Sequence, residues 1–128
     1  MSVEAGTFVV VLVTTGSAEE GRRIGRAMVE ERLAACVNVV GPIRSIYRWE
    51  GAVEEADEHL LVIKARAADV PALTARVRVL HSYDVPEVVA LPLTGGSEAY
   101  LAWLAAATDR ALMTSRCSSA SSTAPSHR

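Results

Sequence analysis

The chain has 128 residues, half of them hydrophobic, and a formal net charge of −2 at pH 7. This length is enough for one domain with a hydrophobic core and too short for two. The hydrophobic content excludes a chain that is disordered throughout. The slightly acidic balance argues against nucleic acid or an anionic membrane as the main partner.

The first residues have no features of a secretory signal or a membrane span. Met1–Thr7 carry no basic residue, and the apolar run that follows, Phe8–Val13, is too short for either kind of segment. The two cysteines, Cys36 and Cys117, are too few for a disulfide framework. We therefore expect a cytoplasmic protein.

The chain opens with a strand and a helix. Phe8–Thr15 is an almost unbroken run of apolar and β-branched residues, which is typical of a strand buried on both faces. Ser17 and Glu20 then have the spacing of a capping box, so they predict the start of a helix. We expect this helix to end near Ala35.

Two long strands follow. The second strand begins at Cys36 and the third spans roughly Glu54–Arg66, with a turn at Glu50-Gly51 between them. We expect the two strands to pair as an antiparallel hairpin. Gly41-Pro42 cannot continue a regular ladder and predicts a bulge or a bend. Alternation along the second strand places on one face Val37, Val39, Ile43, Tyr47 and Trp49.

The remaining elements complete the order βαββαβ with a C-terminal helix. We expect a helix over Asp69–His81, a strand over Val88–Leu93 and a last helix over Ser97–Leu112. The predicted fold class is α+β, a ferredoxin-like sandwich in which strands joined through a helix pair parallel. This domain covers residues 1–113, and the Ser-rich stretch 114–128 is expected to be a disordered tail.

The hairpin is too long for the domain that carries it. About thirteen residues at about 3.3 Å each extend about 40 Å, whereas a domain of this size has a radius of gyration of about 13 Å. Ile46, Tyr47 and Trp49 should therefore project from the body. Because a bare two-stranded ribbon is only marginally stable in water, the sequence predicts an obligate oligomer.

The third strand begins with the densest acidic cluster of the chain, which consists of Glu54, Glu55, Asp57 and Glu58. The cluster lacks the spacing and the glycine turns of a loop that binds a hard cation. We interpret it as a solvated strand edge that discourages stacking.

Five segments together resemble the CutA divalent-cation tolerance family. They occur in order and without obvious gaps between Phe8 and Arg110, so the resemblance covers most of the chain. The segments are Glu31–Asn38, Ser45–Gly51, Ile63–Lys64, His81–Tyr83 followed by Pro86-Glu87, and Tyr100–Leu104.

This resemblance implies a ferredoxin-like subunit in a tight homotrimer that is similar to the PII nitrogen regulators, with the extended hairpin embracing neighbouring subunits. It also implies a role in tolerance of copper and other divalent metals, without an enzymatic activity. Some family members place metal-binding residues where this chain has Val13 and Leu80. His81 remains from that set, and Cys36 stands at the commonest cysteine position of the family.

A copper ion prefers thiolate and imidazole ligands and usually takes two to four of them. His81 and Cys36 are the candidate ligands for such a metal ion, and two residues predict at most weak binding. Two other interpretations remain open. Cys36 can be a small buried hydrophobic residue, and His81 can be a cation that interacts with the carbonyl groups at the helix end.

Lys64 and Glu87 are expected on inner strands, where an unpaired charge is costly. They can form a salt bridge or the polar floor of an intersubunit pocket for a small anion. Tyr83, Trp49 and Trp103 are further candidates for a ligand cleft between subunits, although both tryptophans are equally typical of a core or an interface.

The βαββαβ order allows four classes of function. A non-enzymatic homotrimer in the response to metal ions is favoured, and the alternative is a PII-like sensor of a small molecule or a trimeric scaffold for partner proteins without a metal role. An acylphosphatase-like enzyme would need an anion-binding loop that Thr14–Ser17 does not offer. An RNA-binding domain would need aromatic residues on both inner strands.

Overall fold

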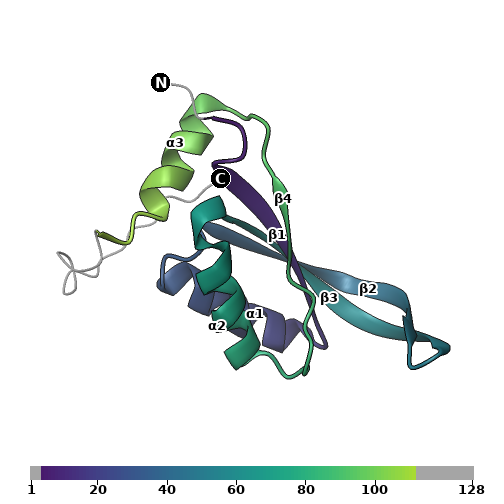
Figure 1. The fold of residues 1–128 in the computed structure, drawn as a ribbon. Coiled ribbons are helices and arrows are strands. Elements are labelled where there is room, and N and C mark those ends of the chain that lie inside the picture. Colours follow the sequence, from purple (N-terminus) through teal and green to yellow (C-terminus); the bar gives the residue numbers. More distant parts are fainter. Residues whose placement is uncertain (1–3, 112–128) are drawn as a thin grey trace.

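The computed structural model describes residues 4–111, so the predicted tail over 114–128 and the predicted end of the last helix at Leu112 lie outside the described residues. The order of elements, βαββαβ followed by a helix, confirms the predicted α+β, ferredoxin-like plan (Figure 1). The elements are β1 (Phe8–Thr15), α1 (Ala18–Glu30), β2 (Cys36–Trp49), β3 (Ala52–Arg66), a 3₁₀ turn (Ala67–Asp69), α2 (Val70–Leu80), β4 (Val89–Pro92) and α3 (Glu98–Ala107).

The four strands form one sheet in the order β2-β3-β1-β4, and every neighbouring pair is antiparallel. The expected hairpin of β2 and β3 is confirmed. The expectation that strands joined through a helix pair parallel is wrong. Such strands run in the same direction, but a third strand lies between them: β3 separates β1 from β2, and β1 separates β3 from β4.

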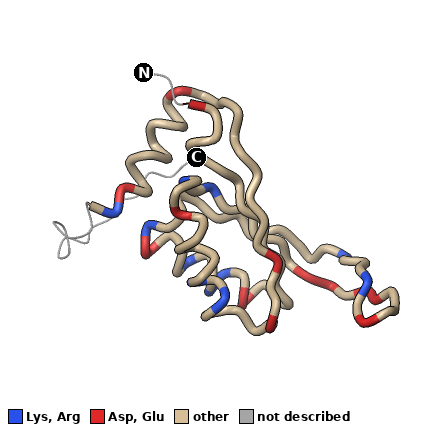
Figure 2. Tube along the Cα trace, viewed as in Figure 1, with Lys and Arg blue, Asp and Glu red and all other residues tan. Residues whose placement is uncertain are grey.

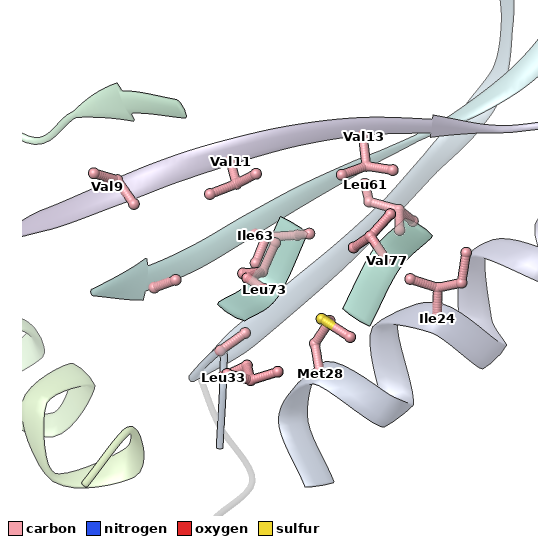
Figure 3. Close-up of a cluster of buried hydrophobic side chains, with 12 residues drawn as sticks. Val9, Val11, Val13, Ile24, Met28, Leu33, Leu61, Ile63, Leu73 and Val77 are labelled. Carbon is pink, nitrogen blue, oxygen red and sulfur yellow. The ribbon is translucent and has the colours of Figure 1, made fainter. Parts of the chain in front are cut away.

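Helices α1 and α2 cover one face of this sheet and form the core with it (Figure 3). Alternate residues of β1 and β3 point to this face because strand side chains alternate with period two. They meet two fully buried residues of each helix. The central members of this cluster are Val9, Val11 and Val13 of β1, Leu61 and Ile63 of β3, Ile24 and Met28 of α1, and Leu73 and Val77 of α2.

Helix α1 ends at Glu30, five residues before the predicted end, because the chain turns into the left-handed conformation at Arg32, with φ of 59°. The N–H of Leu33 donates to the carbonyl of Met28, and the N–H of Arg32 donates to that of Val29. This pair of bonds is a Schellman motif, which usually carries glycine at the left-handed position. Because arginine stands where glycine is usual, the sequence lacks the signal that would have predicted the helix end.

Helix α3 covers one end of the opposite face. Its Leu101 and Leu104 pack on Phe8, and the guanidinium of Arg66 donates to the hydroxyl of Thr108 at 2.8 Å and to the carbonyl of Ala105 at 2.7 Å. Among the described residues, no helix lies over the rest of this face. Its apolar side chains include the half-buried Val10, Leu12 and Val62 and the exposed Val89 and Leu91.

The hairpin of β2 and β3 projects beyond the helices as a two-stranded ribbon (Figure 1), as predicted. Ile46 is 65% exposed, Trp49 55% and Val53 64%. A single subunit therefore leaves the large apolar side chains of the ribbon in contact with water.

Gly41-Pro42 forms the expected bulge, since the pairing of β2 with β3 shifts by one residue between Val40 and Ile43. A side chain on Gly41 would place Cβ 2.8 Å from the His59 ring, so the close approach requires glycine. The extra residue reverses the alternation beyond the bulge. The expectation that five odd-numbered residues share one face is therefore wrong: Val37 and Val39 face α1, whereas Tyr47 and Trp49 lie on the other face.

The contact between α1 and β2 yields a prediction for stability. A Cβ on Gly25 would lie 2.9 Å from Cγ1 of Val37, a short and stiff side chain. We expect Gly25→Ala to lower the free energy of unfolding by about 1–2 kcal/mol in chemical denaturation, because overpacking outweighs the better helix propensity of alanine.

The control is Gly95→Ala, because a Cβ at Gly95 would have no atom within 4 Å. This variant should change the free energy of unfolding by less than about 0.5 kcal/mol. Equal stabilities for the two variants would show that α1 does not depend on this close approach.

Candidate functional site

A groove of about 590 Å³ lies between the ribbon and the segment that joins α2 to β4. It combines acidic, aromatic and hydroxyl side chains from four parts of the fold. Thr14 comes from the end of β1, Ser45, Ile46, Tyr47 and Trp49 from β2, Glu58 from β3, and Tyr83, Asp84, Val85 and Glu87 from the segment before β4.

One wall of the groove is fixed by Glu20, which is almost fully buried at the start of α1. Its Oε2 accepts from the backbone N–H of Ser82 at 2.7 Å, and its Oε1 accepts from that of Gly16 at 3.3 Å. Burial raises the pKa of Glu20, but the hydrogen bonds from Ser82 and Gly16 outweigh burial, so this pKa lies below its ordinary value. The carboxylate thus holds the segment after α2 against the turn that precedes α1.

His81 is the first residue of this segment, and its side chain is fully buried. Its Nε2 lies 2.7 Å from the carbonyl of Thr14, and its Nδ1 accepts from the N–H of Tyr83 at 3.0 Å. Nε2 must donate to the carbonyl and Nδ1 must accept from the N–H, so this geometry assigns the neutral Nε2-protonated tautomer. Both ring nitrogens are used in holding the backbone.

Tyr83 contacts the buried His81 on one side and lines the groove on the other. Its ring centroid lies 4.6 Å from that of His81, and its hydroxyl donates to Oε2 of Glu58 at 2.7 Å. Burial and the hydrogen bond to the negatively charged Glu58 raise the pKa of Tyr83 strongly. The hydroxyl therefore remains protonated at neutral pH and acts as a donor.

The groove is acidic. Glu58, Asp84 and Glu87 line it, and none of the lysines and arginines within residues 4–111 does. Figure 2 shows acidic positions both on the ribbon and on the segment that leads from α2 to β4. Its charge therefore disfavours the small anion that we considered for an intersubunit pocket.

The structure brings three of the five predicted cleft residues, Tyr83, Trp49 and Glu87, to one groove. The other two lie elsewhere. Lys64 donates to the side-chain amide oxygen of Asn38, and no ion pair between Lys64 and Glu87 occurs within residues 4–111. Trp103 is 41% exposed on α3, beside Tyr100 at a ring-centroid distance of 5.4 Å.

The two predicted metal ligands are not brought together. Cys36 pairs in register with Lys64, which lies opposite Val10, whereas His81 binds the carbonyl of Thr14. Four residues along β1 correspond to about 13 Å. Within the described part of the chain, no group of three or more His, Cys, Asp or Glu residues could hold a metal ion. The donors of one subunit therefore do not fit the ligand set of a copper ion.

Sequence reasoning missed Glu58 and Glu20. We interpreted Glu58 as part of a solvated strand edge, but it is only 8% exposed. Its position two residues before Leu60, on the same face as Leu60 and Val62, was the available signal. The sequence indicates only a capping-box role for Glu20, and nothing near it in the sequence indicates a bond to Ser82.

A protein-family model described as CutA1 divalent ion tolerance protein matches residues 9–107. The chain belongs to the CutA family. A divalent-cation tolerance protein CutA from Thermus thermophilus is 54% identical over 95 residues, which are 74% of this chain and 92% of that protein. The chloroplastic CutA of Arabidopsis thaliana is 51% identical over 75% of this chain but only 53% of its own length, so the chain spans about half of that relative.

Solved CutA structures share the fold. The divalent cation tolerance protein of Thermus thermophilus aligns with a TM-score of 0.75 and 52% identity, over 76% of this chain and 94% of its own. CutA1 of Oryza sativa aligns with a TM-score of 0.79 and 45% identity, over 84% of this chain and 97% of its own. These similarities confirm the family and the ferredoxin-like fold class that the sequence predicted.

The cytoplasmic location stays a prediction. No helix within residues 4–111 is long and apolar enough to cross a membrane. A CutA of Archaeoglobus fulgidus, 33% identical over 80% of this chain and 99% of its own, with a TM-score of 0.77, is described as periplasmic.

The bonds of Glu20 predict a pH dependence of stability. Because the folded pKa lies below the ordinary value of 4.5, Glu20 stabilises the fold above that pH, and the contribution is lost as the pH falls through the folded pKa. We expect Glu20→Gln to lower the free energy of unfolding by about 1–3 kcal/mol at pH 7. Glutamine has only one acceptor oxygen, so one of the two backbone N–H groups would lose its partner.

Denaturant titrations of both proteins from pH 7 to pH 3 check this expectation, and the difference should shrink as the pH falls below 4.5. Glu19→Gln, at an exposed position in the same helical turn, is the control and should cost at most about 0.5 kcal/mol. A constant difference at all pH values would mean that the carboxylate charge is not what holds the segment.

Proposed function

We propose that this CutA chain forms a non-enzymatic homotrimer that contributes to the tolerance of divalent metal ions, copper in particular, in the cytoplasm. The observation that carries the proposal is the apolar surface that one subunit leaves open: the uncovered half of the sheet together with the projecting ribbon.

Association of copies would remove this surface from water. Val89 is 48% exposed and Leu91 52%, and they adjoin the apolar side chains of β1 and β3 on the same face. Contiguous apolar patches of this kind mark interaction surfaces. The ribbon adds Ile46, Trp49 and Val53, which an isolated two-stranded ribbon cannot cover.

The sheet order supports a closed ring of copies. Strands β2 and β4 are both edges of the sheet, and they differ in length: fourteen residues in β2 and four in β4. Contact between unlike surfaces of successive copies is head-to-tail, and such contacts close into rings when the rotation permits. The number three rests on the resemblance of the chain to the trimeric CutA proteins.

The metal role rests on the family and on the names of relatives, which are divalent-cation tolerance proteins rather than enzymes. We infer that direct contact of one subunit with copper is weak and involves Cys36 more than His81.

A second candidate function is that of a PII-like sensor, in which a small effector binds to the subunit and changes what the assembly binds. The groove favours it, because about 590 Å³ with aromatic walls and a few fixed polar groups is typical of a small-molecule site. In a trimer whose ribbons embrace neighbours, this groove would lie at the boundary between two subunits.

The assembly is tested by its mass in dilute solution. We expect wild-type protein to have three times the single-chain mass of 13.6 kDa by light scattering after size-exclusion chromatography. Leu91→Glu should shift the mass toward that of a single chain, because a charge would be buried in an apolar interface.

Val79→Glu is the matched control, since Val79 is even more exposed, at 73%, but lies on the outer side of α2. It should leave the mass unchanged. A wild-type protein that remains a single chain at micromolar concentration would refute the trimer.

The metal ligands are tested by calorimetric titration of Cu²⁺ into wild type, Cys36→Ser and His81→Ala. We expect Cys36→Ser to reduce the binding heat, because a thiolate is a preferred copper ligand. His81→Ala should lower the melting temperature, since it removes two backbone contacts, and leave the heat unchanged.

Circular dichroism at the titration temperature ensures that His81→Ala is still folded. Loss of copper binding in folded His81→Ala would contradict our assignment of His81 to a structural role. The same null trace from all three proteins would remove direct copper binding and leave a trimeric scaffold for partner proteins.

A further inference from the structure

We propose that the acidic groove binds a small organic cation that carries ammonium or guanidinium groups. This inference rests on the second candidate function, that the groove takes a small effector, and it names the chemical class of that effector. Three features of the groove carry it: a buried carboxylate without a counter-ion, aromatic rings around it, and the spacing of its acids.

Glu58 is the first feature. It is only 8% exposed, and its one hydrogen bond in the described residues comes from the neutral hydroxyl of Tyr83. No lysine, arginine or histidine of residues 4–111 forms an ion pair with it. A buried carboxylate without a cationic partner is costly, so a cation that enters the groove would gain strongly from this contact.

Aromatic side chains are the second feature. Tyr47, Trp49 and Tyr83 line the same groove, and each remains between 37% and 55% exposed. The faces of such rings attract ammonium and guanidinium groups, and the attraction grows when the cation loses its water. Aromatic walls next to carboxylates therefore select organic cations over neutral ligands of the same size.

The spacing of the acids is the third feature, and it separates an organic cation from a metal ion. Glu58, Asp84 and Glu87 come from β3 and from two places before β4, and they do not form a group that could hold one metal ion. A divalent metal ion needs several oxygen ligands within about 2–2.6 Å. A chain-like cation with separated charges can instead reach two carboxylates in turn.

The experiment uses four-carbon probes that differ only in charge. 1,4-Diaminobutane carries two positive charges, 1,4-butanediol none and succinate two negative charges. Binding is followed by the fluorescence of Trp49 in a Trp103→Phe background, because Trp103 lies on α3 and away from the groove lining. We expect a response to the diamine that weakens with added salt, and none to the diol or to succinate.

Two groove variants and one control locate the site. Glu58→Gln and Glu87→Gln should each weaken diamine binding by about tenfold or more, the effect of losing one charge contact of about 1.4 kcal/mol. Glu87→Gln covers the case in which Glu58→Gln fails to fold. Glu30→Gln removes the same charge from an exposed position on α1 and should leave binding unchanged.

The remaining outcomes separate this inference from the sensor function. If the diol or succinate binds, and its affinity is the same in wild type and in both groove variants, the cation class is overturned and the effector proposal stands. Absence of any probe binding at millimolar concentration would overturn both. If Mg²⁺ or Cu²⁺ at the same concentration displaces bound diamine, and Glu58→Gln abolishes this displacement, the groove is a metal site instead.

A second copy of the chain could also fill the groove with its own basic side chains. In that case the diamine would bind only to Leu91→Glu, and this outcome would overturn the proposal.

Discussion

Side chains along β1 and β3 alternate between a face that two helices seal and a face that one subunit leaves largely open. The sealed face supplies the core, in which Val11, Val13, Leu61 and Ile63 are fully buried. The open face repeats the same apolar chemistry without a cover, and α3 reaches only one end of it. A strand that is apolar on both sides needs partners on both sides. One subunit thus has apolar side chains on both faces of its sheet, but two helices cover one face and α3 covers only one end of the other.

The groove depends on the same arrangement. The segment after α2 crosses from the sealed side to the start of β4, and buried polar contacts of Glu20 and His81 hold it there. These contacts keep Tyr83 beside Glu58 at the base of the ribbon. Rigid support of this kind lets a few side chains keep a fixed geometry at an exposed site. The buried carboxylate of Glu20 and the imidazole of His81 therefore do not line the groove but fix the position of the segment that does.

Much of the fold was accessible from the sequence because its signals are local. The apolar run of β1 and the overlong hairpin identified the elements, and the motifs around Trp49 and His81 identified the family. Two of the errors concern the local backbone. Arg32 adopts the left-handed conformation that glycine usually takes, and the bulge at Gly41 was expected but its effect on alternation was not followed. The groove was only partly predictable, because Glu58 and Tyr83 are twenty-five positions apart in the chain.

The bulge at Gly41-Pro42 has a consequence for how this arm could change in length. Beyond it, strand parity determines which side chains lie on the groove face of the ribbon, as Tyr47 does, and which lie on the other face, as Arg44 does. Removing a single residue from β2 there would exchange the two sets, whereas adding two residues to each strand would preserve both. Natural lengthening or shortening of the arm is therefore restricted to even steps per strand, and an odd step is tolerable only when a second bulge restores the phase.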